Sequence, residues 1–164
     1  MKPSRFPEPI DPNPLHRPMT EPLKTDLALS RREAGTQTSD RQGVDLLNAR
    51  GDLLLADGRR NLAQALLNRL YTRRGALAQL GHPGYGSRLH QLIGEPDTRR
   101  TRALAEFYVR EALTADPRVK EVAAVTFEKP DRTTLQRHVL AMHVTVIPVD
   151  GGAMTVTVAT GVGG

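Results

Sequence analysis

Histidine is the residue type in this chain best suited to binding a metal or moving a proton, and the sequence contains five. His138 and His143 are five positions apart on one expected strand, so their side chains face opposite sides and cannot share a metal. His82 and His90 flank a turn and could approach each other, but the sequence offers no evident third ligand. The chain has no cysteine, which excludes disulfides, cysteine-based zinc sites, iron–sulfur clusters and thiol catalysis. We therefore expect no metal site and no cofactor.

Carboxylates are the second set of side chains that could do chemistry, and five of them lie on or beside one expected helix. A glycosidase needs two carboxylates opposed across a cleft. Two of the five, Glu106 and Glu111, are five positions apart and do not share a helix face. The chain has no HExxH, GxSxG, Walker or GxGxxG motif. The sequence alone does not exclude a catalytic pair, but we expect solvated helix acids and a cap; the five are Glu95, Asp97, Glu106, Glu111 and Asp116.

The charge of the chain is mildly positive, with 23 basic and 18 acidic side chains and a net charge of +5. Nucleic-acid binding favours a longer basic stripe interleaved with aromatic side chains, and aromatic residues are only 4% of this sequence. No apolar run approaches the roughly 18 residues that span a bilayer. No apolar core of a secretory signal is visible near the N-terminus. We expect a protein made in the cytoplasm that neither binds nucleic acid nor inserts into a membrane.

Proline is concentrated at the N-terminus, where seven of the twelve prolines fall within the first 22 residues. Proline at this density removes helix donors and favours extended, polyproline-like backbone. Residues 23–42 have no strong period and could hold one short helical turn. We therefore expect residues 1–42 to form an extended proline-rich arm and residues 43–164 to form the packed domain.

The first part of the expected domain combines a hairpin with two short helices. Two apolar runs in residues 44–57 flank Asn48-Ala49-Arg50-Gly51, a pattern typical of a β-hairpin. Leucines at helical spacing predict a helix over about 59–71. Ser87 is suited to cap a short helix that Gly94 closes.

A longer helix is expected to begin at Pro96-Asp97-Thr98, with Asp97 as its cap. Pro117 disfavours helical backbone at Asp116, so this helix should end near Ala115. The residues expected to line its buried face, with their neighbours, are Leu104, Phe107, Tyr108, Ala112 and Leu113.

After Pro117 the apolar pattern changes from a helical period to alternation. We expect strands at about 119–127, 138–149 and 154–160, with turns at Pro130-Asp131 and Asp150-Gly151-Gly152. The fold class is therefore α+β, with a small helical body packed on a C-terminal antiparallel β-sheet over about 119–160. An exposed edge of such a ribbon is an aggregation hazard unless another strand pairs with it. This favours an interaction protein over an enzyme.

Two stretches of the chain together resemble a known family. The first is DGRRNLAQALLNRLYT (57–72), followed by Gly75, HPGYGSRL (82–89) and LIG (92–94). The second is REAL (110–113), which leads into DPRV (116–119). Their order resembles the baseplate wedge, or sheath-initiator, family of contractile phage tails, extracellular injection particles and type VI secretion. The family is sometimes labelled baseplate lysozyme, and the resemblance covers about residues 44–160.

The signature of that family is Glu-Pro-Arg at the end of the long helix, and this chain has Asp116-Pro117-Arg118 there. The resemblance implies that the tripeptide docks onto the wedge core bundle of a baseplate. Arg118 offers a bidentate guanidinium to a carboxylate, and Asp116 would orient that arginine or accept a bond from the partner. The alternative is a helix stop with a local ion pair. Aspartate in place of glutamate keeps the charge and shortens the reach by one methylene.

The resemblance also implies that residues 138–160 present strands to the first ring of sheath subunits, so that the sheath polymerises from this template. It implies sheath subunits and baseplate wedge proteins as partners, and roughly six copies in a ring of a phage tail or tail-like particle. We add the hypothesis that residues 1–42 contact neighbouring tube, spike or hub proteins. The sheath-pairing residues expected on this basis are Val139, Ala141, His143, Thr145, Ile147, Met154, Val156 and Val158.

Two other functions stay open at this point. The family label raises a peptidoglycan-cleaving, lysozyme-like hydrolase, against which the lack of a carboxylate pair counts. The mild positive charge is also consistent with a small nucleic-acid-binding protein, and an affinity for DNA that depends on salt would support that function. We expect a non-enzymatic assembly protein.

Overall fold

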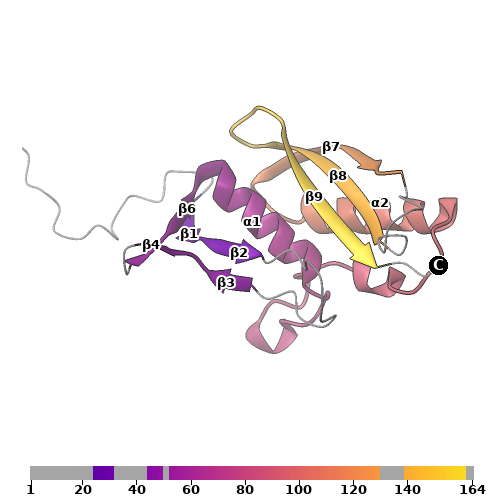
Figure 1. Cartoon of the computed structure of the whole chain (residues 1–164), viewed down its shortest axis with the longest axis horizontal. Coiled ribbons are helices and arrows are strands. Elements are labelled where there is room, and N and C mark those ends of the chain that lie inside the picture. Colours follow the sequence, from indigo (N-terminus) through magenta and orange to yellow (C-terminus); the bar gives the residue numbers. More distant parts are fainter. Residues whose placement is uncertain (1–23, 32–43, 50–51, 130–138, 162–164) are drawn as a thin grey trace, which may run out of the picture.

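The structure is built around a three-stranded antiparallel sheet with two helices packed against it (Figure 1). It is a computed structural model that describes residues 24–31, 44–49, 52–129 and 139–161. The α+β fold class is confirmed. The helical elements are α1 (Gly58–Tyr71), η1 (Ala78–Leu80), η2 (Leu89–Leu92) and α2 (Arg99–Thr114), where η marks a 3₁₀ helix. The strands of the sheet, in spatial order, are β7 (Val119–Phe127), β8 (Val139–Pro148) and β9 (Met154–Gly161).

Alternation along β8 divides the sheet into a buried face and an open face. The even-numbered residues from Leu140 to Val146 are at most 1% exposed and belong to one core with residues of α1 and α2. Val156 and Val158 of β9 extend the same face. Burying an aliphatic side chain of this size contributes about 1.5–3 kcal/mol relative to exposure. The contact between sheet and helices therefore holds the two halves of the domain together.

The long helix α2 starts after Thr98, and four of the five residues expected on or beside its buried face are buried or pack against the core. Thr98 and not Asp97 is the N-cap, because its hydroxyl accepts a hydrogen bond from the Thr101 backbone N–H at 3.1 Å. The carboxylate of Asp97 instead accepts two bonds from Arg102, each 2.7 Å long. Phe107, expected beside the buried face, is 56% exposed. The buried residues of α2 are Thr101, Ala105, Val109, Ala112 and Leu113.

Short strands before α1 form an antiparallel layer that begins earlier in the chain than the expected hairpin (Figure 1). The hairpin itself is present, because β4 pairs with β5. In addition, β1 pairs with β6 and β2 pairs with β3, so residues 25–27 and 29–31 are strands and residues 24–31 contain no helical turn. These elements are β1 (Thr25–Leu27), β2 (Leu29–Arg31), β3 (Val44–Leu46), β4 (Asn48–Ala49), β5 (Asp52–Leu53) and β6 (Leu55–Asp57).

Gln64 of α1 attaches this layer to the helical body. Its side-chain amide donates to the Leu27 carbonyl, and its side-chain oxygen accepts from the Leu29 N–H, both at 2.8 Å. One glutamine therefore bonds the backbone on both sides of Ala28, which is 1% exposed.

The remaining expectations on secondary structure are confirmed, corrected in part or fall outside the described residues. The helix over 59–71 and the three C-terminal strands are confirmed. The short helical turn is present as η2, but its N-cap is Arg88 and not Ser87, and its C-cap is Ile93 and not Gly94. The turn at Pro130-Asp131, residues 1–23 and 32–42 of the arm, and His138 lie outside the described residues. Within the described part of the chain, no helix has the length and apolar character needed to cross a membrane.

Candidate functional site

Asp116 lies between the end of α2 and the start of β7, where it binds its own neighbour Arg118. Its carboxylate accepts hydrogen bonds from Arg118 Nε and Nη2, both at 2.9 Å, and from the Arg118 backbone N–H at 3.0 Å. Asp116 is only 3% exposed. Pro117, between the two, fixes the backbone direction at this corner. The tripeptide therefore forms a local ion pair in which Asp116 orients Arg118.

Arg69 of α1 adds a second cation to this carboxylate. Its Nη2 lies 3.8 Å from Asp116 Oδ2, and its guanidinium lies over the Tyr85 ring, 4.5 Å from the ring centre. Arg69 Nε is buried and has no hydrogen-bond partner among the described residues. We call Asp116, Arg118, Arg69 and Tyr85 the Asp116 cluster. It joins α1, the loop after α1 and the start of β7 through one carboxylate.

The charge states of the Asp116 cluster follow from these contacts. Burial raises the pKa of the Asp116 carboxyl, but hydrogen bonds from Arg118 and the charges of Arg118 and Arg69 outweigh burial and lower that pKa. The hydrogen bond to Asp116 raises the pKa of Arg118. Asp116 is therefore held as an anion, which makes it unsuited to act as a general acid. Arg118 Nη1 makes no hydrogen bond to a described residue, so this nitrogen can donate to a partner.

The residues expected to pair with the sheath lie on two opposite faces of the sheet. Those of β8, namely Val139, Ala141, His143, Thr145 and Ile147, lie on the open face. Those of β9 lie on the core face, where Val156 and Val158 are 4% and 1% exposed and Met154 packs against the core. The structure therefore does not bring the eight side chains together into one surface.

Strand order decides which backbone is available for pairing. β8 is the central strand and is hydrogen-bonded on both sides. β7 is an edge strand, but two register shifts interrupt its pairing with β8, and Arg110 Nη1 donates to the Val122 carbonyl. Bulges of this kind discourage edge-to-edge pairing. The β9 strand pairs with β8 without a register shift over its full length and forms the other edge.

The outward-facing backbone groups of β9 belong to alternate residues. Tyr71 Oη accepts a hydrogen bond of 3.3 Å from the Ala159 N–H, so Ala159 faces away from β8. Alternation along an antiparallel strand then places Thr155 and Thr157 on the same outer edge. Both threonines are exposed, and within the described residues their backbone groups on this side have no hydrogen-bond partner. The unpaired edge of the sheet is therefore centred on Thr155 and Thr157.

The side chains of these two threonines are bonded across to β8 on the open face. Thr155 Oγ1 lies 3.3 Å from Thr145 Oγ1, and Thr157 Oγ1 lies 3.1 Å from His143 Nδ1. The other ring nitrogen of His143 lies 2.8 Å from Glu128 Oε1. These contacts fix the threonine rotamers and leave the backbone free. The sequence interpretation missed both threonines because alternation gives the faces of a strand but not its free side.

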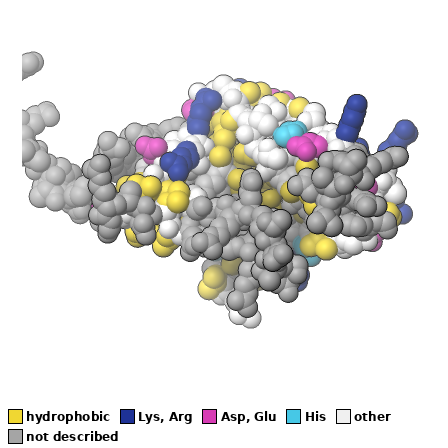
Figure 2. Space-filling model, in the orientation of Figure 1, with side chains coloured by type: hydrophobic (Ala, Val, Ile, Leu, Met, Phe, Trp, Pro, Cys, Tyr) yellow, Lys and Arg dark blue, Asp and Glu magenta, His cyan; other side chains and the backbone are white. Residues whose placement is uncertain are grey.

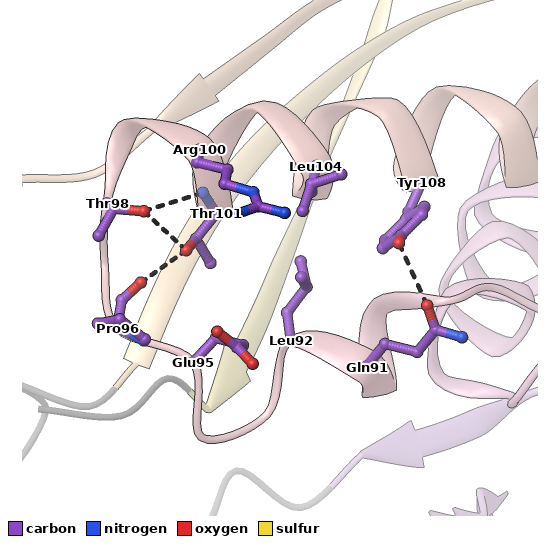
Figure 3. A pocket seen from close by; sticks show the side chains of 9 residues that line it. All are labelled: Gln91, Leu92, Glu95, Pro96, Thr98, Arg100, Thr101, Leu104 and Tyr108. Atoms are coloured by element: carbon purple, nitrogen blue, oxygen red, sulfur yellow. Dashed lines mark hydrogen bonds between the residues drawn. The ribbon is translucent and has the colours of Figure 1, made fainter.

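The candidate acids are not assembled into a catalytic pair. A groove of about 560 Å³ lies between η2 and the start of α2 (Figure 3), and Glu95 is the single carboxylate among its lining residues. A glycosidase would need a second one facing it. The other four candidates each bind an arginine, in the pairs Asp97–Arg102, Glu106–Arg110, Glu111–Arg74 and Asp116–Arg118.

The histidines that the structure describes belong to no group that could hold a metal ion. His82 is exposed at the surface, and His90 Nδ1 lies 3.2 Å from the Ser87 carbonyl. Over the described ranges, no group of three or more histidine, aspartate or glutamate side chains is arranged to hold a metal ion.

Two comparisons relate the chain to known proteins. The family model described as "Contractile injection system sheath initiator" matches residues 38–143. Among solved structures, the chain is similar to a crystal structure from Geobacter sulfurreducens that carries the provisional name tail lysozyme. The TM-score is 0.55 at 19% identity, over 69% of this chain and 98% of that one, which shows a shared fold. A search of curated proteins found no match. Because the family model matches more than half of its residues, the chain belongs to the contractile injection system sheath initiator family, which has a structural role in the baseplate.

Proposed function

We propose that this protein joins the baseplate wedge to the first ring of the sheath and that it acts without catalysis. The observation that carries the proposal is the β9 edge, a regular strand whose outward groups at Thr155 and Thr157 are unpaired among the described residues. A strand of a sheath subunit added at this edge would extend the sheet by backbone hydrogen bonds. Each net bond of this kind is worth about 0.5–1.5 kcal/mol.

The sheet provides a template because its edge is already formed before the sheath arrives. β9 is held in place by Val156 and Val158 in the core, so an incoming strand meets an ordered edge. Ordering a strand costs roughly 1–2 kcal/mol per residue in backbone entropy, and β9 is already ordered when the chain folds. A ring of roughly six copies would in this way lower the barrier to starting the sheath. In this proposal the open-face residues of β8 flank the joined strands and do not pair with them.

The wedge contact is proposed for the Asp116 cluster. Asp116 holds the Arg118 guanidinium by two of its nitrogens, so Nη1 is presented in a fixed direction. A carboxylate or backbone carbonyl of the wedge core bundle would accept from it. Arg118 then acts as a pre-oriented donor whose rotamer entropy is lost on folding and not on docking.

The N-terminal residues supply a separate proposal. We propose that the arm predicted over residues 1–42 follows neighbouring tube, spike or hub proteins through its proline-rich residues 1–22, since β1 and β2 pair with strands of the sheath-initiator domain predicted over residues 43–164. Seven prolines in the first 22 residues suit an extended segment that lies along a partner surface. The protein would be made in the bacterial cytoplasm and assembled there into a phage tail or a tail-like particle.

A proline at the β9 edge tests the sheath proposal. In Thr157→Pro the lost N–H points away from β8, so the internal ladder keeps its bonds while an added strand loses a donor. Deleting β8 and β9 would not serve, because these strands carry much of the core. Thr157→Val is the matched control, since it keeps the backbone donor and the β-branched shape.

Electron microscopy of particles gives the readout. We expect Thr157→Pro baseplates to contain the protein and to stand on bare tubes, while Thr157→Val particles carry full sheaths. Full sheaths on Thr157→Pro particles would remove the β9 edge from the mechanism.

A further inference from the structure

The loop that follows α1 projects from the body and is exposed almost throughout (Figure 1). We call residues 73–84 the projecting loop. Leu80 near its tip is 73% exposed, the largest exposed fraction among the exposed large hydrophobic residues of the described chain. Figure 2 shows hydrophobic side chains at the lower end of the molecule, where this loop lies. A leucine exposed to this degree contributes little to folding.

The base of the projecting loop is closed by backbone hydrogen bonds. Ser87 N–H donates to the Thr72 carbonyl at 2.8 Å, and Arg74 N–H donates to the Ser87 carbonyl at 2.9 Å. The two chain segments at the base of the loop approach so closely at Gly86 that a Cβ there would lie 2.6 Å from the Thr72 carbonyl oxygen. The φ of Gly86 is +104°, which side chains other than glycine rarely adopt. The backbone hydrogen bonds and the close approach at Gly86 therefore fix the two chain segments at the base of the loop relative to each other.

The interior of the projecting loop is also ordered by its own backbone. His82 N–H donates to the Leu77 carbonyl at 3.0 Å, and Gly81 N–H donates to the Ala78 carbonyl at 3.1 Å around η1. The loop thus keeps a defined shape although most of its side chains face solvent. A loop that is already ordered loses little conformational entropy on binding, and this favours its use as a docking element.

The charge of this region is one-sided. Residues 72–94 include three arginines and no aspartate or glutamate. Two of the arginines, Arg74 and Arg88, are paired with Glu111 of α2. Arg73 is exposed and forms no ion pair with a described residue. The loop therefore offers an apolar tip and one free cation near its base.

We infer that the projecting loop is a docking element that inserts Leu80 into an apolar pocket with an acidic rim on a second baseplate protein. An acidic rim is the charge that complements Arg73 and the acid-free segment around it. A membrane is the weaker candidate, because stable attachment to anionic lipid takes a cluster of several free basic residues and this loop offers one. The inference uses the structural role of the family in the baseplate and does not depend on the β9 proposal.

Two loop substitutions and one control test the inference in particles assembled with the full chain. Leu80→Ser and Arg73→Glu alter exposed side chains, so their thermal unfolding should match that of the wild type. We expect each to lower the copies of this protein per purified particle by roughly tenfold, as measured by quantitative mass spectrometry. Phe107→Ser is the matched control, because it removes another exposed large apolar side chain, on α2. Wild-type incorporation of both loop variants would overturn the inference.

Photo-crosslinking identifies the occupant of the loop. Benzoylphenylalanine at position 80 should give an adduct with a baseplate protein other than the sheath subunit, and the same probe at position 107 should give less of it. Adducts with the sheath alone, or none above the control, would overturn the inference. So would co-sedimentation of the purified protein with phosphatidylserine vesicles that Leu80→Ser abolishes, since it would assign the loop to a membrane. Thr157→Pro should retain the protein in the baseplate, which separates failure of the sheath proposal from failure of this one.

Discussion

The hydroxyl of Tyr71, the last residue of α1, accepts a hydrogen bond of 3.3 Å from the backbone N–H of Ala159 on the outer edge of β9. A side chain of the helical body thus occupies a backbone position that an added strand would use. The free positions on this edge are Thr155 and Thr157, and Tyr71 marks where they end. Tyr71, which lies outside the sheet, therefore limits how many backbone groups of this edge are left unpaired.

Removing the Tyr71 hydroxyl should release the Ala159 amide. In Tyr71→Phe we expect hydrogen exchange at Ala159 to accelerate by roughly fivefold, because a net hydrogen bond of about 1 kcal/mol is lost. The amide of Val158, which faces β8, serves as the internal control and should keep its rate. Equal Ala159 rates in variant and wild type would show that the hydroxyl does not protect this edge.

The Asp116 carboxylate should be a strong contributor to stability. Asp116→Ala leaves Arg118 and Arg69 largely buried and without their shared anion, which should cost roughly 3 kcal/mol in free energy of unfolding. Glu106→Ala is the control, because the Glu106–Arg110 pair is more exposed and worth less than about 1 kcal/mol. Urea titration measures both values. Similar losses in the two variants would show that Asp116 stabilises the fold no more than an exposed carboxylate does.

The same carboxylate gives stability a defined dependence on pH. The pKa of Asp116 is lower in the folded chain than its ordinary value of 3.8. Its contribution is therefore fully present above about pH 4 and is lost as the pH falls from 3.8 through the folded pKa. Asp97, held by Arg102, shifts in the same direction. We expect the free energy of unfolding to fall below pH 4 more steeply in the wild type than in Asp116→Asn, with identical slopes contradicting the shift.

Two glycines of the loop after α1 should respond differently to alanine. Gly86→Ala places a Cβ against the Thr72 and Arg73 backbone at a positive φ, and we expect a loss of about 2 kcal/mol or more. Gly84→Ala meets nothing within 4 Å and should be neutral or stabilising by a few tenths of a kcal/mol. Thermal unfolding distinguishes the two, and a tolerated Gly86→Ala would mean that the loop base can shift.

Local patterns in the sequence predict most of the regular elements. Leucines spaced at helical intervals identify α1, since all three of Leu62, Leu66 and Leu70 are buried. Strict alternation identifies β8 and β9 and separates their two faces. The face of α2 was harder to predict, because its apolar residues permit two neighbouring stripes. Packing against the sheet selects the one with Ala105 and Val109 and leaves Phe107 outside.

Features that depend on distant pairing could not be predicted from local pattern. β1 gains its strand structure from β6, where Thr25 faces Asp57. The local pair of Asp116 with Arg118 could be predicted, but the second cation at this carboxylate is Arg69 of α1, which is near only in the folded chain. The unpaired edge at Thr155 and Thr157 follows from strand order, which places β8 in the middle and β9 outside.

The contrast between the two edges of the sheet has a consequence for stoichiometry. In the proposed mechanism the sheet would grow at β9 only, because β7 has two register shifts and its Val122 carbonyl is bonded by Arg110. Each copy would then accept one added strand. Free copies would not join edge to edge into chains before assembly, because that would need two edges able to pair. In a ring of such copies, each copy would pair with one sheath strand, so the number of sheath strands would equal the number of copies and no branch would form.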